Sequence, residues 1–161
     1  MTHWLFIFLV FFTDLNAQSI SEQIVKINVP DITVQSGKSS VIIINVEVKK
    51  GYHIQANKVN DEFLIPTTLE ITKDKSIEQG EQVFPAAKKF KLEGTNDFLN
   101  VYDGSFEIRI PFKTTQRIQK YKSYLQAKLR YQACNFKSCL FPKTIDFIIP
   151  LAIININADK N

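Results

Sequence analysis

The sequence predicts an all-β protein that folds as a single immunoglobulin-like β-sandwich. Its 161 residues are enough for one domain with an apolar core, and 45% of them are hydrophobic. Short apolar runs rich in Val, Ile, Thr, Tyr and Phe alternate with clusters of turn residues, a pattern typical of several short strands. No window of twelve residues carries an apolar stripe of helical spacing.

Six runs are expected to form strands, because β-branched and aromatic residues dominate each of them. The fourth run alternates most clearly: Phe106, Ile108 and Ile110 face one side, and Glu107 and Arg109 face the other. In chain order the runs are Ile24–Val29, Ser40–Val48, Thr68–Thr72, Ser105–Phe112, Tyr124–Ala133 and Thr144–Ile153.

Turn-forming residues separate these runs, since glycine and small polar residues adopt the backbone angles that tight turns require. Residues Thr115–Lys122 are polar, and we expect them to form a turn or a short helix. The separating segments are Ser36–Lys38, Lys50-Gly51, Gly80, Glu93–Asp97 and Asp103-Gly104.

The N-terminus has the pattern of a secretory signal peptide. Trp4–Phe12 is an apolar run too short to span a bilayer, and Leu15–Ala17 suits a cleavage site. We expect residues 1–17 to be a signal peptide and residues 18–161 to form one exported domain, although the segment before the run lacks Lys and Arg. The alternative, an uncleaved anchor, needs a longer apolar stretch. No membrane span is expected after cleavage.

Several function classes are poorly supported. The formal net charge of +4 is spread over many lysines, and the doublets Lys49-Lys50 and Lys88-Lys89 are not interleaved with aromatic residues, so no nucleic-acid partner is expected. Hydrolase and nucleotide-binding motifs are missing from the sequence. We interpret His53 as a strand or loop residue, and Asp61 and Glu62 as solvated loop charges. No cofactor and no metal are expected.

The two cysteines, Cys134 and Cys139, carry the chemistry that the sequence suggests. Their C-x4-C spacing is not C-x-x-C and lies outside any βαβ pattern, which disfavours a thioredoxin fold. Two thiols are too few for a structural zinc site. A four-residue loop between antiparallel strands could place them opposite each other, with Cα atoms roughly 4.5–5.5 Å apart, within disulfide range. A structural disulfide and a redox-active one both remain open on this evidence.

The residues around the pair favour reactivity modestly. Lys137 and Arg130 add positive charge, which stabilises a thiolate. Tyr131, Phe136 and Phe141 could shield the sulfurs and contact a substrate protein, or could pack as ordinary strand residues. A non-enzymatic binding module with a structural disulfide is therefore the alternative to a thiol–disulfide exchange protein.

The cysteine segment resembles the N-terminal periplasmic domain of the thiol:disulfide interchange protein DsbD. In that family a Tyr-Gln-x-Cys strand end and a Cys-x-Pro-Pro strand start flank the reactive disulfide, and here Tyr131–Cys134 and Cys139–Thr144 are similar. The resemblance extends over roughly residues 20–155. Weaker similarities lie at Lys50–Ile54, Phe84-Pro85, Val101-Tyr102 and Asp103–Phe112.

The resemblance implies an immunoglobulin-like domain of the bacterial periplasm that works as a protein-disulfide reductase. Cys139 would be the attacking thiol and Cys134 the thiol that resolves the mixed disulfide. Electrons would come from a membrane-embedded thiol/disulfide donor or a thioredoxin-like domain. They would pass to a periplasmic disulfide isomerase or to a thioredoxin-like protein of cytochrome c maturation.

Three features depart from the family pattern. The loop between the cysteines has four residues where the best-known members have five, and Phe141 stands where the family often has a proline. The family's cap loop, which covers the disulfide, would correspond to about Phe90–Phe98, whereas Asp61–Phe63 comes too early. The printed sequence holds neither a membrane domain nor a thioredoxin-like domain, so we expect a separate protein to supply the reductant.

Overall fold

The computed structural model describes residues 23–94, 98–115 and 120–155. Within these ranges it contains strands and no helix, so no described helix could cross a membrane. The predicted signal peptide, residues 1–17, lies outside the described residues. The strands are β1 (Val25–Asn28), β2 (Ile32–Gln35), β3 (Ser39–Val48), β4 (His53–Gln55), β5 (Thr68–Ile71), β6 (Ile77–Gln79), β7 (Lys88–Lys91), β8 (Phe98–Tyr102), β9 (Ser105–Thr114), β10 (Lys120–Tyr131), β11 (Ala133–Cys134) and β12 (Lys143–Ile154).

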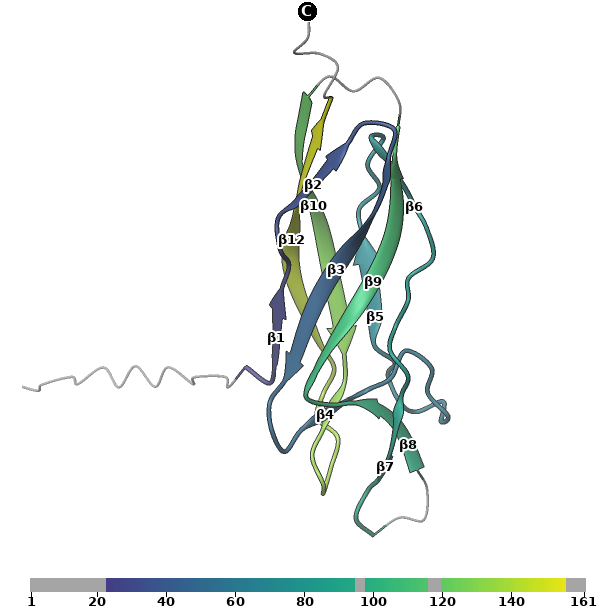
Figure 1. Cartoon of the computed structure of the whole chain (residues 1–161). Coiled ribbons are helices and arrows are strands. Elements are labelled where there is room, and N and C mark those ends of the chain that lie inside the picture. Colours follow the sequence, from purple (N-terminus) through teal and green to yellow (C-terminus); the bar gives the residue numbers. More distant parts are fainter. Residues whose placement is uncertain (1–22, 95–97, 116–119, 156–161) are drawn as a thin grey trace, which may run out of the picture.

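Two four-stranded sheets form the expected immunoglobulin-like sandwich, which confirms the predicted fold class (Figure 1). One sheet has the order β1-β3-β9-β6 and the other β2-β12-β10-β5. Apolar side chains alternate inward along the long strands, as in β9, where Ile108 and Ile110 are buried and Glu107 and Arg109 are exposed. The fully buried aliphatic residues come from both sheets and include Ile42, Ile44, Ile108, Ile110, Leu125, Leu129, Ile149, Leu151 and Ile153.

The N-terminal strands divide between the two sheets. Strand β1 pairs antiparallel with β3, whereas β2, only three residues further along, pairs parallel with β12 at the edge of the other sheet. Ile32 and Val34 of β2 are buried in the core, and Ile32 lies opposite Leu151 of β12. The chain therefore crosses from one sheet to the other before the sandwich's long hairpins begin.

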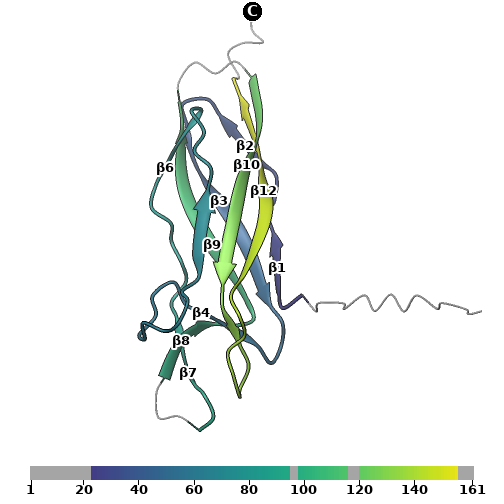
Figure 2. The ribbon, with the colours of Figure 1, turned by 180° about the vertical axis from the view of Figure 1, so that it is seen from behind.

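A third sheet, in the order β11-β4-β8-β7, lies at one end of the sandwich, as both views show (Figures 1 and 2). Strand β11 follows β10 after Gln132 and pairs with β4, so this small sheet begins where a long sandwich strand ends. Strands β7 and β8 form a hairpin that completes it. Both cysteines lie at this end of the molecule.

All six predicted strands are present, with small shifts at their ends. The predicted run Tyr124–Ala133 divides at Gln132 into β10 and β11. The turn or short helix expected for Thr115–Lys122 is wrong for Lys120–Lys122, which begins β10 because Lys120 pairs with Ile154 of β12. Residues 116–119 lie outside the described residues. The strands that the sequence did not predict are short: β2, β4, β6, β7 and β8.

The carboxylate of Asp74 connects the loop between β5 and β6 to strand β10. Asp74, in the β5–β6 loop, accepts hydrogen bonds from the backbone N–H (2.8 Å) and the hydroxyl of Ser76. It also accepts from Tyr121 Oη at 3.0 Å and from Ser123 Oγ at 3.1 Å. Desolvation alone would raise the pKa of Asp74, but the hydrogen bonds outweigh it and the pKa lies below its ordinary value.

An Asp74→Asn variant is expected to be less stable than the wild type at neutral pH by about 1 kcal/mol, because charged acceptors bond more strongly than neutral ones. The folded-state pKa is lowered, so this contribution is present above the unfolded-state pKa and disappears as the pH falls through the folded-state pKa. Urea unfolding at neutral and strongly acidic pH tests this. The control is Asp146→Asn, whose carboxylate forms an exposed ion pair with Lys128 and should change stability little at either pH.

Candidate functional site

The structure contains a disulfide between Cys134 and Cys139 that closes the four-residue loop 135–138 (yellow-green at the lower end of Figure 1). The two residues face each other as an isolated antiparallel bridge, with Cys134 at the end of β11. Their sulfurs are 2.04 Å apart and their Cα atoms 3.9 Å apart. The Cα separation is shorter than the 4.5–5.5 Å expected for ordinary cross-strand neighbours.

Hydrogen bonds that do not involve sulfur also hold this loop. Asn135 Oδ1 accepts from the backbone N–H groups of Lys137 (2.8 Å) and Ser138 (2.9 Å), which is an Asx-turn arrangement. The N–H of Asn135 donates to the carbonyl of Ser138, and the N–H of Leu140 donates to the carbonyl of Ala133. The hairpin geometry therefore has supports besides the S–S bond.

The two sulfur-bearing residues differ in exposure. Cys134 is fully buried, whereas Cys139 is partly exposed. Thiol–disulfide exchange requires an incoming thiolate to reach one sulfur. Of this pair, Cys139 is the more accessible target.

Two side chains of β4 lie on the same strand face beside the disulfide. Strand β4 pairs with β11 so that His53 is opposite Cys134, and Gln55 follows two positions later. The Gln55 Nε2 group lies 3.2 Å from Cys134 Sγ and 3.8 Å from Cys139 Sγ, within hydrogen-bond range for sulfur. Both residues are buried.

His53 is a buried side chain of the small sheet. Burial lowers its pKa, and the charge of Asp103 opposes that shift only in part. The ring packs on Phe90 of β7, with centroids 3.8 Å apart. Its Nε2 atom has no hydrogen-bond partner among the described residues. His53 was expected to be a strand or loop residue, and it begins β4.

The β7–β8 hairpin contacts the disulfide loop. The backbone N–H of Glu93 donates to the carbonyl of Phe136 at 3.1 Å. This hairpin contains the stretch Phe90–Phe98 that the resemblance suggested as a cap, and residues 95–97 of that stretch lie outside the described residues. Phe63, in the earlier Asp61–Phe63 segment, is 83% exposed.

The three aromatic residues predicted to contact a partner lie in different environments. Phe136, in the loop, is 57% exposed, and Phe141, just after Cys139, is 92% exposed. Lys137 Nζ lies 5.3 Å from the centroid of the Phe136 ring. Tyr131, at the end of β10, is instead buried in the core, and this burial raises its pKa. The structure thus places two of the three rings on the surface beside the disulfide.

Sequence reasoning did not select Gln55. Its two-residue offset from His53 would put both side chains on one face of a strand. However, the sequence did not predict β4 as a strand, and nothing local reveals that β4 pairs with β11. The pairing alone brings the amide to the sulfurs.

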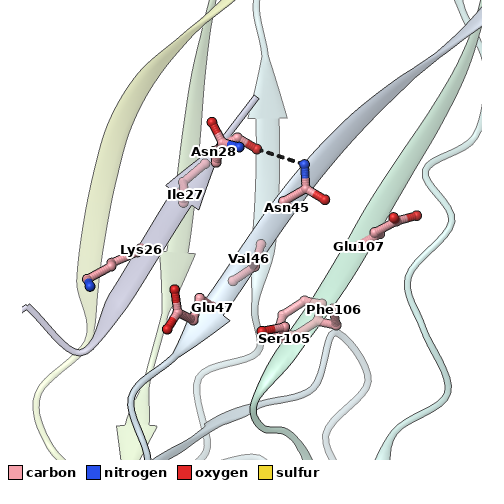
Figure 3. Close-up of a pocket in the computed structure, with 9 residues that line it drawn as sticks. All are labelled: Lys26, Ile27, Asn28, Asn45, Val46, Glu47, Ser105, Phe106 and Glu107. Atoms are coloured by element: carbon pink, nitrogen blue, oxygen red, sulfur yellow. Dashed lines mark hydrogen bonds between the residues drawn. The ribbon is translucent and has the colours of Figure 1, made fainter. Parts of the chain in front are cut away.

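A shallow hollow on the β1-β3-β9 surface shows no reactive arrangement (Figure 3). Its lining includes Lys26, Glu47, Phe106 and Glu107, and none of its residues belongs to the small sheet or the disulfide loop. Across the described parts of the chain, no three His, Cys, Asp or Glu side chains gather where they could hold a metal ion. The disulfide and its surroundings are therefore the candidate site.

Comparisons with known proteins identify a family that this chain resembles. The family model described as "Thiol:disulfide interchange protein DsbD, N-terminal" matches residues 22–149. The N-terminal periplasmic domain of ScsB from Proteus mirabilis is similar in structure, with a TM-score of 0.52 and 16% identity over 83% of this chain. This chain spans 46%, about half, of the ScsB chain.

A second solved structure is the reduced N-terminal domain of DsbD from Neisseria meningitidis. It has a TM-score of 0.42 and 15% identity, and the match covers 71% of this chain and 79% of that one. No curated protein matches the sequence.

Proposed function

Because the chain belongs to the family of the DsbD N-terminal domain, we propose that it is an exported thiol–disulfide exchange protein. It carries reducing equivalents to disulfides of other exported proteins through a reversible Cys134–Cys139 disulfide, and so acts as a protein-disulfide reductase. In this proposal residues 1–17 are removed on export and residues 18–161 form the working domain in the periplasm.

The observation that carries the proposal is the position of the disulfide. It closes a four-residue hairpin loop at one end of the sandwich, with Cys139 partly exposed. Closing so short a loop restrains the unfolded chain little and stabilises the fold by about 2 kcal/mol. Hydrogen bonds made by Asn135 hold the same loop. A site that can open and close without loss of the fold is what repeated exchange requires.

The exchange proceeds in two balanced steps. The Cys139 thiolate attacks one sulfur of the substrate disulfide, a mixed disulfide forms, and the other substrate sulfur leaves as a thiolate. The Cys134 thiolate then attacks Cys139 Sγ, the Cys134–Cys139 bond forms, and the second substrate sulfur leaves. Two electrons pass to the substrate, and water supplies the protons that its thiolates take up.

Partner contact falls to the exposed rings of Phe136 and Phe141. Buried Tyr131 supports the end of β10 before Cys134 rather than meeting the partner directly. We propose that a membrane-embedded thiol/disulfide donor or a thioredoxin-like domain reduces the pair. The acceptor would be a periplasmic disulfide isomerase or a thioredoxin-like protein of cytochrome c maturation.

The reduction potential of the pair tests this function. Exchange proteins have potentials of about −180 to −270 mV, so we expect roughly −200 to −260 mV, with the fold kept in both redox states. The exported protein would be equilibrated in graded thiol/disulfide buffers, and free thiols counted by alkylation and mass. Trp fluorescence cannot serve, because Trp4 is the only tryptophan and lies in the predicted signal peptide. A potential below about −300 mV, or unfolding on reduction, would instead indicate a structural disulfide and a binding module.

A further inference from the structure

Gln55 is a buried polar side chain whose amide N–H groups are directed at the disulfide. The residue is fully buried, and its Nε2 atom lies 3.2 Å from Cys134 Sγ. Its backbone is fixed from two sides, since its N–H donates to the carbonyl of Gln132 and its carbonyl accepts from Thr67 Oγ1. These backbone hydrogen bonds therefore fix the position from which the Gln55 side chain reaches Cys134 Sγ.

This amide is poorly placed for stability. Its Oε1 atom is buried and has no hydrogen-bond partner among the described residues. A buried polar atom without a partner destabilises a fold, and most such atoms in proteins are paired. Divalent sulfur is a weak acceptor, so the oxidised disulfide offsets little of this cost. An apolar side chain of the same length would fill the space without leaving an unpaired oxygen.

The reduced state supplies a better acceptor. After reduction Cys134 carries a thiol in a fully buried position, and burial disfavours its ionisation. The same thiol must ionise in order to resolve the mixed disulfide. An N–H donor within hydrogen-bond distance favours the thiolate over the thiol.

We propose that Gln55 is a further catalytic residue, which donates a hydrogen bond to Cys134 Sγ and thereby keeps the buried resolving thiolate available. The inference rests on the proposed exchange function and assigns this residue to its second step. The contact with Cys139 Sγ is longer, at 3.8 Å, so the first step depends on Gln55 less.

The direct test uses Gln55→Met, which keeps the length of the side chain and removes the donor. In a Cys139→Ser background Cys134 is the one remaining thiol, and its ionisation is followed by ultraviolet thiolate absorbance against pH. We expect the thiolate fraction at a given pH to fall about threefold to tenfold, the equivalent of one ordinary hydrogen bond. Gln55→Glu, which has the same shape but adds a negative charge, should lower the thiolate fraction of Cys134 at least as much as Gln55→Met does.

The matched control is Gln132→Met, on the neighbouring segment. The Gln132 amide bonds backbone groups, accepting from the N–H of Ile65 at 3.0 Å and donating to the carbonyl of Leu140 at 3.2 Å. Gln132→Met should lower the free energy of unfolding and leave the thiolate fraction of Cys134 at each pH unchanged. Gln55→Met should show the opposite pattern, with urea stability unchanged or raised. A lower stability with an unchanged titration would reduce Gln55 to a packing residue.

A kinetic test separates the two steps in the chain with both cysteines. The reduced protein is mixed with the aromatic disulfide DTNB, which releases one coloured thiolate when Cys139 attacks and a second when Cys134 resolves. Gln55→Met should slow the second release about threefold to tenfold and leave the first within about twofold. If the second thiolate were released at the same rate in the variant and the wild type, the role assigned to Gln55 would be overturned, but the exchange function would stand. A wild-type potential typical of structural disulfides would overturn the exchange function, while the Cys134 titration would still report on Gln55.

Discussion

Replacing Cys139 with serine is expected to abolish protein-disulfide reduction, because a hydroxyl without an adjacent base does not attack a disulfide. Replacing Cys134 with serine should instead stop the reaction half-way. Cys139 is the more exposed of the two residues, so it can still form a mixed disulfide, but nothing resolves it. Turnover falls to the buffer background in both variants, and a covalent adduct with a disulfide-bonded partner accumulates only in Cys134→Ser.

Mass spectrometry of the trapped adduct and an insulin-reduction assay measure the two effects. The control is Ser138→Ala, because the hydrogen bonds that Ser138 makes within the loop use its backbone groups and survive the change. It should retain turnover close to the wild type. An adduct in Cys139→Ser and none in Cys134→Ser would reverse the assigned roles. Turnover in either serine variant would place the chemistry elsewhere.

The largest expected effect on stability comes from the centre of the sandwich. Ile110 of β9 is fully buried and lies opposite Ile42 of β3, which is also fully buried. Shortening it to alanine removes apolar contacts and leaves a cavity between the sheets. We expect Ile110→Ala to lower the free energy of unfolding by about 2 to 5 kcal/mol, measured by urea denaturation of the oxidised protein.

The same substitution at Ile148 is the matched control. Ile148 lies on β12 with 56% of its surface exposed. Ile148→Ala should change stability by no more than about 0.5 kcal/mol. Equal losses at the two positions would mean that the core is not where the structure places it.

The long strands were predictable because the pattern of residues within each strand determines its conformation and its buried face. Alternation of apolar and charged residues in β9 fixes which face is buried, and the same alternation defines the core. Short strands such as β4 and β11 carry no periodic signal, since each has three residues or fewer and is buried throughout. Their structure follows from pairing between distant segments. Lys120–Lys122 illustrates this, because β12 extends a polar segment into a strand.

The candidate site divides in the same way. The cysteine pair and the flanking aromatic residues are close in sequence, so spacing alone suggested a hairpin disulfide. Gln55 and Glu93 come from other elements and meet the disulfide loop only through β4 and the β7–β8 hairpin. The sequence also did not predict which aromatic side chains are exposed. Tyr131 and Phe141 are both aromatic, but Tyr131 is buried in the core and Phe141 is exposed.

The parallel pairing of β2 with β12 also governs when the protein can finish folding. A contact between Ile32 and Leu151 spans most of the chain, and such a high contact order slows folding. During synthesis the ribosome releases Ile32 and Val34 early. Their strand β2 has no partner until residues 151–154 have been synthesised. An apolar edge that waits for its partner is prone to aggregation. The β2 edge therefore stays unpaired until residues 151–154 are available, and the last step of folding waits for that segment.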